Sequence, residues 1–320
     1  MISTQKHYKE IDSLKGFSIF LVVLGHAIIY FPINLHENIY CESLFRILSS
    51  VHLPLFFVIS GFCFSYHGNY RQHFFKKIKR LLIPYFVFNL LDVIPRAMLP
   101  QFVNRSQSIA DSIRDILLYG GEYWFLFTLF IIFTIFPIIY IYQSGAFARK
   151  IAVGAFLLII AIVKIPTDIF TLSSVSYYLV FFYLGVLLKI SNIKIFDFGH
   201  SKCHILIPTG LTILWLLLIF SPLGNLLEIL VSLLGVVVCY YLTWSNAFNN
   251  VFERFGKYSL QIYLLNGFLL VISRTIICSI VEAPIVIICF NMLVDFVFSY
   301  LFIKYICNRF AFLRISMGMN

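Results

Sequence analysis

The chain has 320 residues, of which 61% are hydrophobic and only 12% are charged, and its mean hydropathy is +0.93. Soluble domains carry about 25% charged residues, so this composition excludes a water-soluble globular protein. The excess apolar surface must face membrane lipid. The net charge of +10 fits the cytoplasmic loops of a membrane protein, and we expect no nucleic-acid partner.

Ten apolar segments are long enough, or nearly long enough, to cross a bilayer as helices. They cover residues 14–33, 45–66, 81–99, 123–142, 151–166, 174–189, 204–220, 226–244, 258–280 and 284–306. The first has no small-residue cleavage site and is expected to stay in the protein as a helix. Because no repeat or long polar insertion interrupts the series, we expect an all-α, polytopic membrane bundle of about ten helices. It forms a single domain over residues 1–320.

The loops between these segments alternate in charge. One set is basic and contains Lys6, Lys9, Arg71, Lys76, Lys77, Lys79, Arg80, Arg149, Lys150, Lys189, Lys194, Lys202, Arg254, Lys257, Arg309 and Arg314. The other set is mainly acidic and contains Glu37, Glu42, Asp111, Asp115, Asp168 and Glu282, with Arg105 and Arg114 as its main cations. Loops rich in Lys and Arg remain on the cytoplasmic side of the membrane. We therefore expect both termini in the cytoplasm and a multi-pass protein of the inner (plasma) membrane.

Two ionisable residues interrupt the first apolar segment. Lys15 lies at its start and His26 follows eleven residues later, so both side chains share one helix face, about 16 Å apart along the axis. Asp12 lies about 40° from His26 on the same helical wheel. An ionisable side chain is costly in hydrocarbon and is a functional candidate by default, although His26 can also be a buried imidazole that bonds a neighbouring helix.

Six further polar or aromatic residues fall at a similar depth in the outer half of the predicted bundle. They are His52, Asp92, Arg96, Glu122, Trp124 and Arg274, which we interpret as candidate substrate-binding residues around a polar cavity. Simpler roles stay open for three of them. Asp92 and Arg96 are spaced to form an ion pair on their own helix, and His52 is placed to bond a carbonyl freed by Pro54.

Four cations, Lys76, Lys77, Lys79 and Arg80, precede the third apolar segment. One interpretation is a topology signal that also attracts anionic lipid headgroups. The other is a binding patch for a cofactor with several phosphates, because Lys77 with Arg80, and Lys76 with Lys79, are three residues apart.

The cysteine pattern points to neither a disulfide framework nor a metal site. The count is odd, no CxxC pair occurs, and most of the seven lie in apolar segments: Cys41, Cys63, Cys203, Cys239, Cys278, Cys289 and Cys307.

Several segments, in this order along the chain, resemble the membrane acyltransferase-3 family. They are DSLKG at 12–16 with ten residues between Lys15 and His26, HLPLFFVISGF at 52–62, KKIKRLLIPY at 76–85, YWFLFTL at 123–129, FFYLGVLLK at 181–189 and FGKYSLQIYLLN at 255–266. The resemblance covers residues 11–266 and is nearest to the fucose 4-O-acetylase-like branch. It implies transfer of an acyl group, usually acetyl from acetyl-CoA, to a sugar hydroxyl of a surface polysaccharide or its lipid-linked precursor.

The chain departs from the family pattern at two positions. Lys15 stands where the family has Arg, which keeps the charge but loses the forked geometry. Asn266 stands where the pattern has His, so we assign no acid–base chemistry there. No soluble hydrolase-like domain follows the membrane part, so we expect acceptor handling within the bundle or in a partner.

The expected mechanism centres on the first helix. Neutral His26 acts as general base on an acceptor hydroxyl, Lys15 and the 76–80 cluster hold the phosphates of acyl-CoA, and Asp12 orients Lys15. A flippase or transporter of a lipid-linked glycan would use the same polar cavity, but the two halves of the chain show no repeat of the kind many transporters have. A structural or export-accessory protein that has lost the chemistry is the third possibility.

Overall fold

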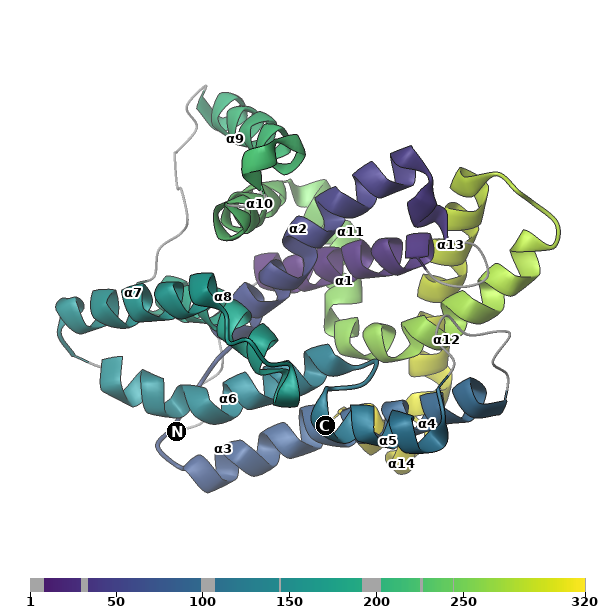
Figure 1. Ribbon diagram of the computed structural model, residues 1–320, viewed down its shortest axis with the longest axis horizontal. Helices are drawn as coiled ribbons and strands as arrows, with labels where there is room; N and C mark the ends of the chain where they lie inside the picture. The colour runs from purple at the N-terminus through teal and green to yellow at the C-terminus, as the bar shows by residue number, and fades with distance from the viewer. Residues whose placement is uncertain are drawn as a thin grey trace.

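The protein is an assembly of helices in the computed structural model (Figure 1), which describes residues 9–29, 34–98, 107–143, 145–191, 203–224, 227–243 and 245–319. All regular structure in these ranges is helical. In chain order the elements are α1 (Lys9–Ile29), η1 (Leu35–Glu37), α2 (Ile39–Phe62), α3 (Tyr70–Lys77), η2 (Ile78–Leu82), α4 (Ile83–Met98), α5 (Ile109–Leu118), α6 (Trp124–Gln143), α7 (Phe147–Val163), η4 (Ile169–Thr171), α8 (Leu172–Ile190), α9 (Cys203–Phe220), η5 (Pro222–Gly224), α10 (Glu228–Leu242), α11 (Asn246–Lys257), α12 (Ser259–Cys278), α13 (Pro284–Phe302), η6 (Ile303–Cys307) and α14 (Ala311–Ser316).

Each of the ten predicted apolar segments corresponds to a helix. Six stretches within the described ranges are long and apolar enough to cross a membrane singly: α1, α2, α6, η4 with α8, α12, and α13 with η6. The helices α4, α7 and α10 are shorter, with 16, 17 and 15 residues, or roughly 22–26 Å, against about 30 Å of hydrocarbon. The structure thus confirms a membrane helical bundle, while ten spans and cytoplasmic termini stay predictions.

Helix α1 is the centre of the bundle and packs against α2, α11, α12 and α13 (Figure 1). It approaches α11 closely, because a glycine on each helix lies against the backbone of the other helix. A Cβ at Gly16 would overlap the carbonyl oxygen of Phe252, and a Cβ at Gly256 would overlap that of Asp12. Only glycine permits this approach. The glycine of the DSLKG segment is therefore needed for the packing that fixes the position of Asp12.

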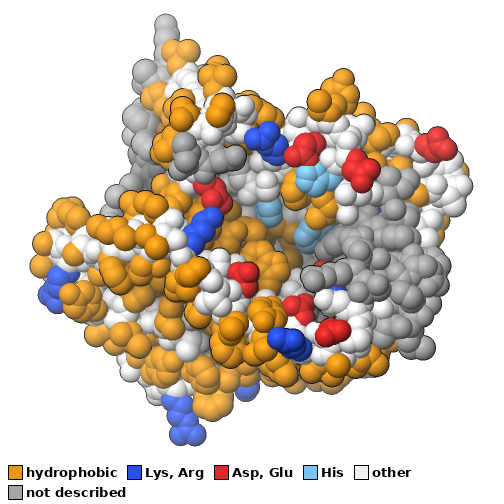
Figure 2. All heavy atoms as spheres, in the orientation of Figure 1, with side chains coloured by type: hydrophobic (Ala, Val, Ile, Leu, Met, Phe, Trp, Pro, Cys, Tyr) orange, Lys and Arg blue, Asp and Glu red, His pale blue; other side chains and the backbone are white. Residues whose placement is uncertain are grey.

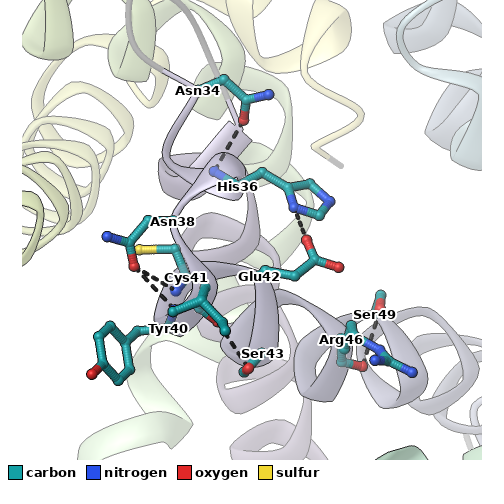
Figure 3. Close-up of polar contacts among 10 residues, drawn as sticks. Asn34, His36, Asn38, Tyr40, Cys41, Glu42, Ser43, Arg46 and Ser49 are labelled. Atoms are coloured by element: carbon teal, nitrogen blue, oxygen red, sulfur yellow. Dashed lines mark hydrogen bonds and ion pairs between the residues drawn. The ribbon is translucent and has the colours of Figure 1, made fainter.

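Two asparagine caps fix the start of α2 (Figure 3). Asn34 accepts a hydrogen bond from the backbone N–H of His36 at 3.1 Å, and Asn38 accepts one from the N–H of Tyr40 at 3.0 Å. Such caps satisfy backbone donors that have no partner inside the helix. His36 also pairs with the Glu42 carboxylate in the first turns of α2. These contacts set the direction in which α2 runs back along α1.

The cation cluster lies on a wide helical turn. Over residues 70–98, α3, η2 and α4 follow one another without a break, and η2 (Ile78–Leu82) is a π turn. A π turn changes the angular spacing of the side chains that follow it and is frequent at functional sites. Lys79 and Arg80 lie inside this turn, so their directions cannot be read from regular α-helical spacing.

The expected topology gives a direct test. Ser108, the exposed N-cap of α5, should lie outside, and exposed His67, between α2 and α3, should lie in the cytoplasm. In a Cys63→Ser background, we expect a membrane-impermeant thiol reagent to label Ser108→Cys in intact cells. It should label His67→Cys only after permeabilisation. The reverse pattern would contradict the topology.

Candidate active site

His26 is held from the neighbouring helix α12. Its Nδ1 lies within hydrogen-bond reach of Oδ1 of Asn266, which is fully buried. An amide oxygen can only accept, so Nδ1 carries the hydrogen and the lone pair of the neutral ring is at Nε2. The simpler interpretation, an imidazole bonded to a neighbouring helix, therefore describes the contact correctly. The contact also fixes the tautomer that a general base at Nε2 requires.

His52 on α2 lies near His26. Its Nδ1 donates to the carbonyl oxygen of Leu48, at 2.6 Å, and the two imidazoles are close enough to repel each other when both are protonated. The carbonyl left without a helical donor by Pro54 is that of Ser50, four residues earlier. The expectation that His52 bonds the carbonyl freed by Pro54 is therefore wrong, because the imidazole bonds one turn back along its own helix.

Three charged residues converge between α4 and the turn that precedes α6. Arg96 on α4 contacts Asp92 through Nε and Glu122 through Nη2. Glu122 is oriented by its backbone N–H, which donates to the Asn89 side chain at 3.0 Å. Asp92 and Arg96 do form the ion pair that their spacing predicts, but the second carboxylate extends it to α6. The Glu122 charge also acts electrostatically on His26.

A hollow opens on one face of the molecule. Figure 2 shows histidine side chains inside the hollow and acidic side chains gathered around its rim, with Lys and Arg side chains among them. A single face rich in acidic groups is what alternating loop charge predicts for the outer side of the bundle.

A second cavity, of about 150 Å³, lies among α1, α2, the 70–98 helical run, α6 and α12. Three cations line it, Lys15, Lys77 and Arg80. The rest of its wall is mostly apolar or aromatic and consists of Val22, Leu53, Phe56, Ile59, Ser60, Cys63, Leu81, Phe125, Leu129, Phe133, Ser259, Leu260 and Tyr263. Val22 precedes His26 by one helical turn, or about 6 Å. The cavity thus extends from Lys15 to within a turn of the imidazole.

The four clustered cations separate into two pairs. Lys77 and Arg80 line the cavity, whereas Lys76 and Lys79 lie outside its lining; of the four, Lys77 alone is partly buried. The Lys77 ammonium sits 3.3 Å from the centre of the Phe133 ring. Burial, with smaller effects of the Arg80 and Lys76 charges, lowers the pKa of Lys77 to about 7.

Lys15 and Asp12 are arranged as the sequence predicts. The Lys15 ammonium donates to Asp12 Oδ1 at 2.9 Å, and both side chains are partly exposed. An ion pair in this setting adds little stability. The pair instead holds the Lys15 ammonium in a fixed position at the wall of the cavity.

The two remaining predicted residues, Trp124 and Arg274, do not line the cavity that contains Lys15. Trp124 begins α6, with its ring 6.2 Å from that of Tyr178. Arg274 is fully buried, and its Nη2 donates to the backbone carbonyl of Ile28 at 3.5 Å. Arg274 therefore contacts the end of α1 that follows His26.

The structure also brings in residues that were not predicted. Asn266 contacts His26, Tyr263 lines the cavity, and Asp295 is fully buried in α13. The rule that singled out His26, an ionisable group in an apolar segment, applies equally to Asp295 and would have found it. Among the described residues, no three His, Cys, Asp or Glu side chains gather as metal ligands would.

The comparisons with known proteins place the chain in a family. A family model described as an acyltransferase domain matches residues 8–304. The chain belongs to the acyltransferase-3 family. This membership confirms the resemblance to the family but does not single out the fucose 4-O-acetylase-like branch. No solved structure matches the chain.

Two curated relatives of this acyltransferase-3 chain are both named nodulation protein NolL. The protein from Sinorhizobium fredii (strain NBRC 101917 / NGR234) is 27% identical over 180 residues, 55% of this chain and 47% of its own length. The protein from Mesorhizobium japonicum (strain LMG 29417 / CECT 9101 / MAFF 303099) is 26% identical over 126 residues, 38% of this chain and 33% of its own length. The matches thus span less than half of these relatives.

Proposed function

We propose that the chain is a membrane O-acyltransferase that moves an acetyl group from acetyl-CoA to a hydroxyl of a glycan. One observation carries the proposal: a cavity with three cations reaches to within one helical turn of His26. An acyl-CoA has its phosphates at one end and its thioester at the tip of a long, uncharged arm. Lys15, Lys77 and Arg80 suit the phosphates, and the apolar wall suits the arm.

The chemistry that we propose needs one base. His26 Nε2 takes the proton of the acceptor hydroxyl while the hydroxyl oxygen attacks the thioester carbon. As the carbon–sulfur bond breaks, the imidazolium returns that proton to the leaving thiolate. The products are the sugar ester and free thiol, and His26 is neutral again.

We propose that the acceptor enters from the hollow on the opposite side of His26. Asp92 and Glu122 offer carboxylate oxygens to sugar hydroxyls, and Arg96 holds both carboxylates in place. The acceptor class is a surface polysaccharide or its lipid-linked precursor, as in the fucose 4-O-acetylase-like branch. The enzyme then works in the inner (plasma) membrane.

The two pairs of cations make a matched comparison. We expect Lys77→Ala with Arg80→Ala to raise the KM for acyl-CoA by about tenfold or more, because each removes a charge-assisted bond to phosphate. Lys76→Ala with Lys79→Ala removes the same charge from positions outside the cavity lining and should raise donor KM by less than about fivefold. Donor KM at two salt concentrations measures both.

Insertion of each variant must be checked, because loop charge also sets topology. If the two double variants are correctly inserted and have equal donor KM values, the cluster acts only as a topology signal.

The state of Lys77 predicts a pH dependence of donor binding. With a pKa of about 7, Lys77 is a cation below that pH and becomes neutral above it. Donor KM should therefore rise between about pH 6 and pH 8. In Lys77→Arg the guanidinium keeps its charge, and this rise should disappear. Donor KM measured across this range for both proteins decides the point, and parallel profiles would contradict the role of Lys77.

Purified protein, acetyl-CoA and a panel of lipid-linked glycans test the proposed function. An acyltransferase releases free CoA thiol only when an acceptor with a reactive hydroxyl is present. A flippase moves the glycan across the bilayer and leaves the thioester intact. Glycan movement in proteoliposomes without thiol release would therefore favour the flippase.

A further inference from the structure

Asp295 is an ionisable residue that is buried in a membrane helix. It lies in α13, within an apolar stretch that is long enough to cross the membrane, and has no exposed surface. A carboxylate in such a place is costly and marks a functional group by default. The group whose hydrogen bonding reaches this carboxylate is Asn266 on α12.

The side-chain amide of Asn266 has an acceptor oxygen, Oδ1, and a donor amino group, Nδ2. Its Oδ1 accepts from Nδ1 of His26, which leaves its Nδ2 amino group to act as donor. In the described part of the chain, that Nδ2 and both Asp295 oxygens are buried without a hydrogen bond of good geometry. Orphaned polar groups are costly, and because α12 packs against α13, a hydrogen bond between Asn266 and Asp295 satisfies both. The three residues then form one row across α1, α12 and α13.

We propose that Asn266 and Asp295 are positioning residues for His26. The Asn266 oxygen keeps the hydrogen on Nδ1 and the lone pair on Nε2. The Asp295 carboxylate, acting through the Asn266 amide, stabilises the imidazolium that forms when His26 takes a proton. The inference rests on the proposed function, because only a proton-accepting His26 needs this support. It also gives the Asn at position 266 a role that requires no acid–base chemistry.

The helices that pack against the His26 half of α1 carry other charged or titratable groups: His52 on α2, Arg274 on α12 and Asp295 on α13. Glu122, in the turn before α6, also acts electrostatically on His26. The helix α11 packs against the other half, near Asp12 and Gly16. Arg96 already pairs with Glu122. Asp295 differs from Glu122 in acting on Asn266, the amide that contacts the imidazole.

The first test is the pH profile of kcat. We expect Asp295→Asn to lower kcat by about tenfold or more, as loss of an orienting carboxylate does elsewhere, with donor KM unchanged. The acid limb of the profile should move to lower pH, because the imidazolium loses an anion. The double variant Asn266→Asp with Asp295→Asn moves the charge next to His26. It should recover kcat and move the acid limb above its wild-type position.

Asn291→Ala is the matched control. Asn291 lies one turn before Asp295, is also fully buried, and accepts from the Ser273 hydroxyl at 2.8 Å. Its loss costs a buried hydrogen bond but should not move the acid limb. Coincident acid limbs in wild type, Asp295→Asn and the double variant would overturn the role of Asp295.

The second test needs no activity. ¹⁵N-histidine NMR of the full chain, with His26→Gln to assign the signal, reports which ring nitrogen of His26 carries the hydrogen. We expect Nδ1–H in the wild type and its loss in Asn266→Ala. An unchanged tautomer in Asn266→Ala would overturn the positioning role. Failure of the wild type to transfer any acyl group would overturn only the proposed function.

Discussion

His26→Ala should lower acceptor-dependent acyl transfer by about 10²-fold or more, the usual contribution of a positioned general base. The substitution removes the imidazole that lies one helical turn beyond Val22 of the donor cavity and on which the Glu122 charge acts. The effect belongs in kcat, because the phosphate-binding cations are untouched. Steady-state rates with acetyl-CoA and the best acceptor of the panel measure it.

The control for His26→Ala is His67→Ala, which changes an exposed histidine between α2 and α3. We expect wild-type rates from it. If correctly inserted His26→Ala kept full activity, the base would have to be another group, and the flippase interpretation would gain ground.

Lys15→Ala should also lose most activity, whereas Lys15→Arg should keep a good part of it. The Lys15 charge lines the donor cavity and is held by Asp12 at 2.9 Å. Alanine removes the charge, while arginine preserves it and matches the residue that the family pattern has at this position. Donor KM and kcat for the two variants separate loss of phosphate binding from a general defect.

Lys9→Ala provides the comparison for Lys15→Ala, because it removes an exposed cation from the first turn of the same helix. It should leave donor KM unchanged if the position of the charge matters. Equal losses in Lys9→Ala and Lys15→Ala would mean that α1 needs only positive charge at this end.

The sequence predicted the helical membrane fold because apolar length is a local property. All ten predicted segments correspond to helices, although α4, α7 and α10 are shorter than a full span. Helix α1 begins at Lys9, five residues earlier than the apolar run. Its polar start is stabilised by α11, which crosses it at Gly16. Packing partners of this kind cannot be read from hydropathy.

The site was predicted less completely than the fold. The apolar pattern placed Lys15 near the start of a helix and His26 near its end, and α1 (Lys9–Ile29) has them there. Regular helical spacing did not show that Lys77 and Arg80, but not Lys76 and Lys79, line the cavity, because a π turn interrupts that helix. The contact of His26 with Asn266 joins residues 240 positions apart and depends on tertiary packing alone.

The most direct measurement follows an isotope-labelled acetyl group from acetyl-CoA with wild type and His26→Ala in parallel. Both proteins are purified, shown to be folded, and incubated with the lipid-linked glycan panel. The account predicts that label appears on a glycan hydroxyl as an ester, in equal amount to the released thiol, with wild type and about 10²-fold more slowly with His26→Ala. Label that stays on CoA with every acceptor, or transfer that proceeds equally fast without His26, would contradict it.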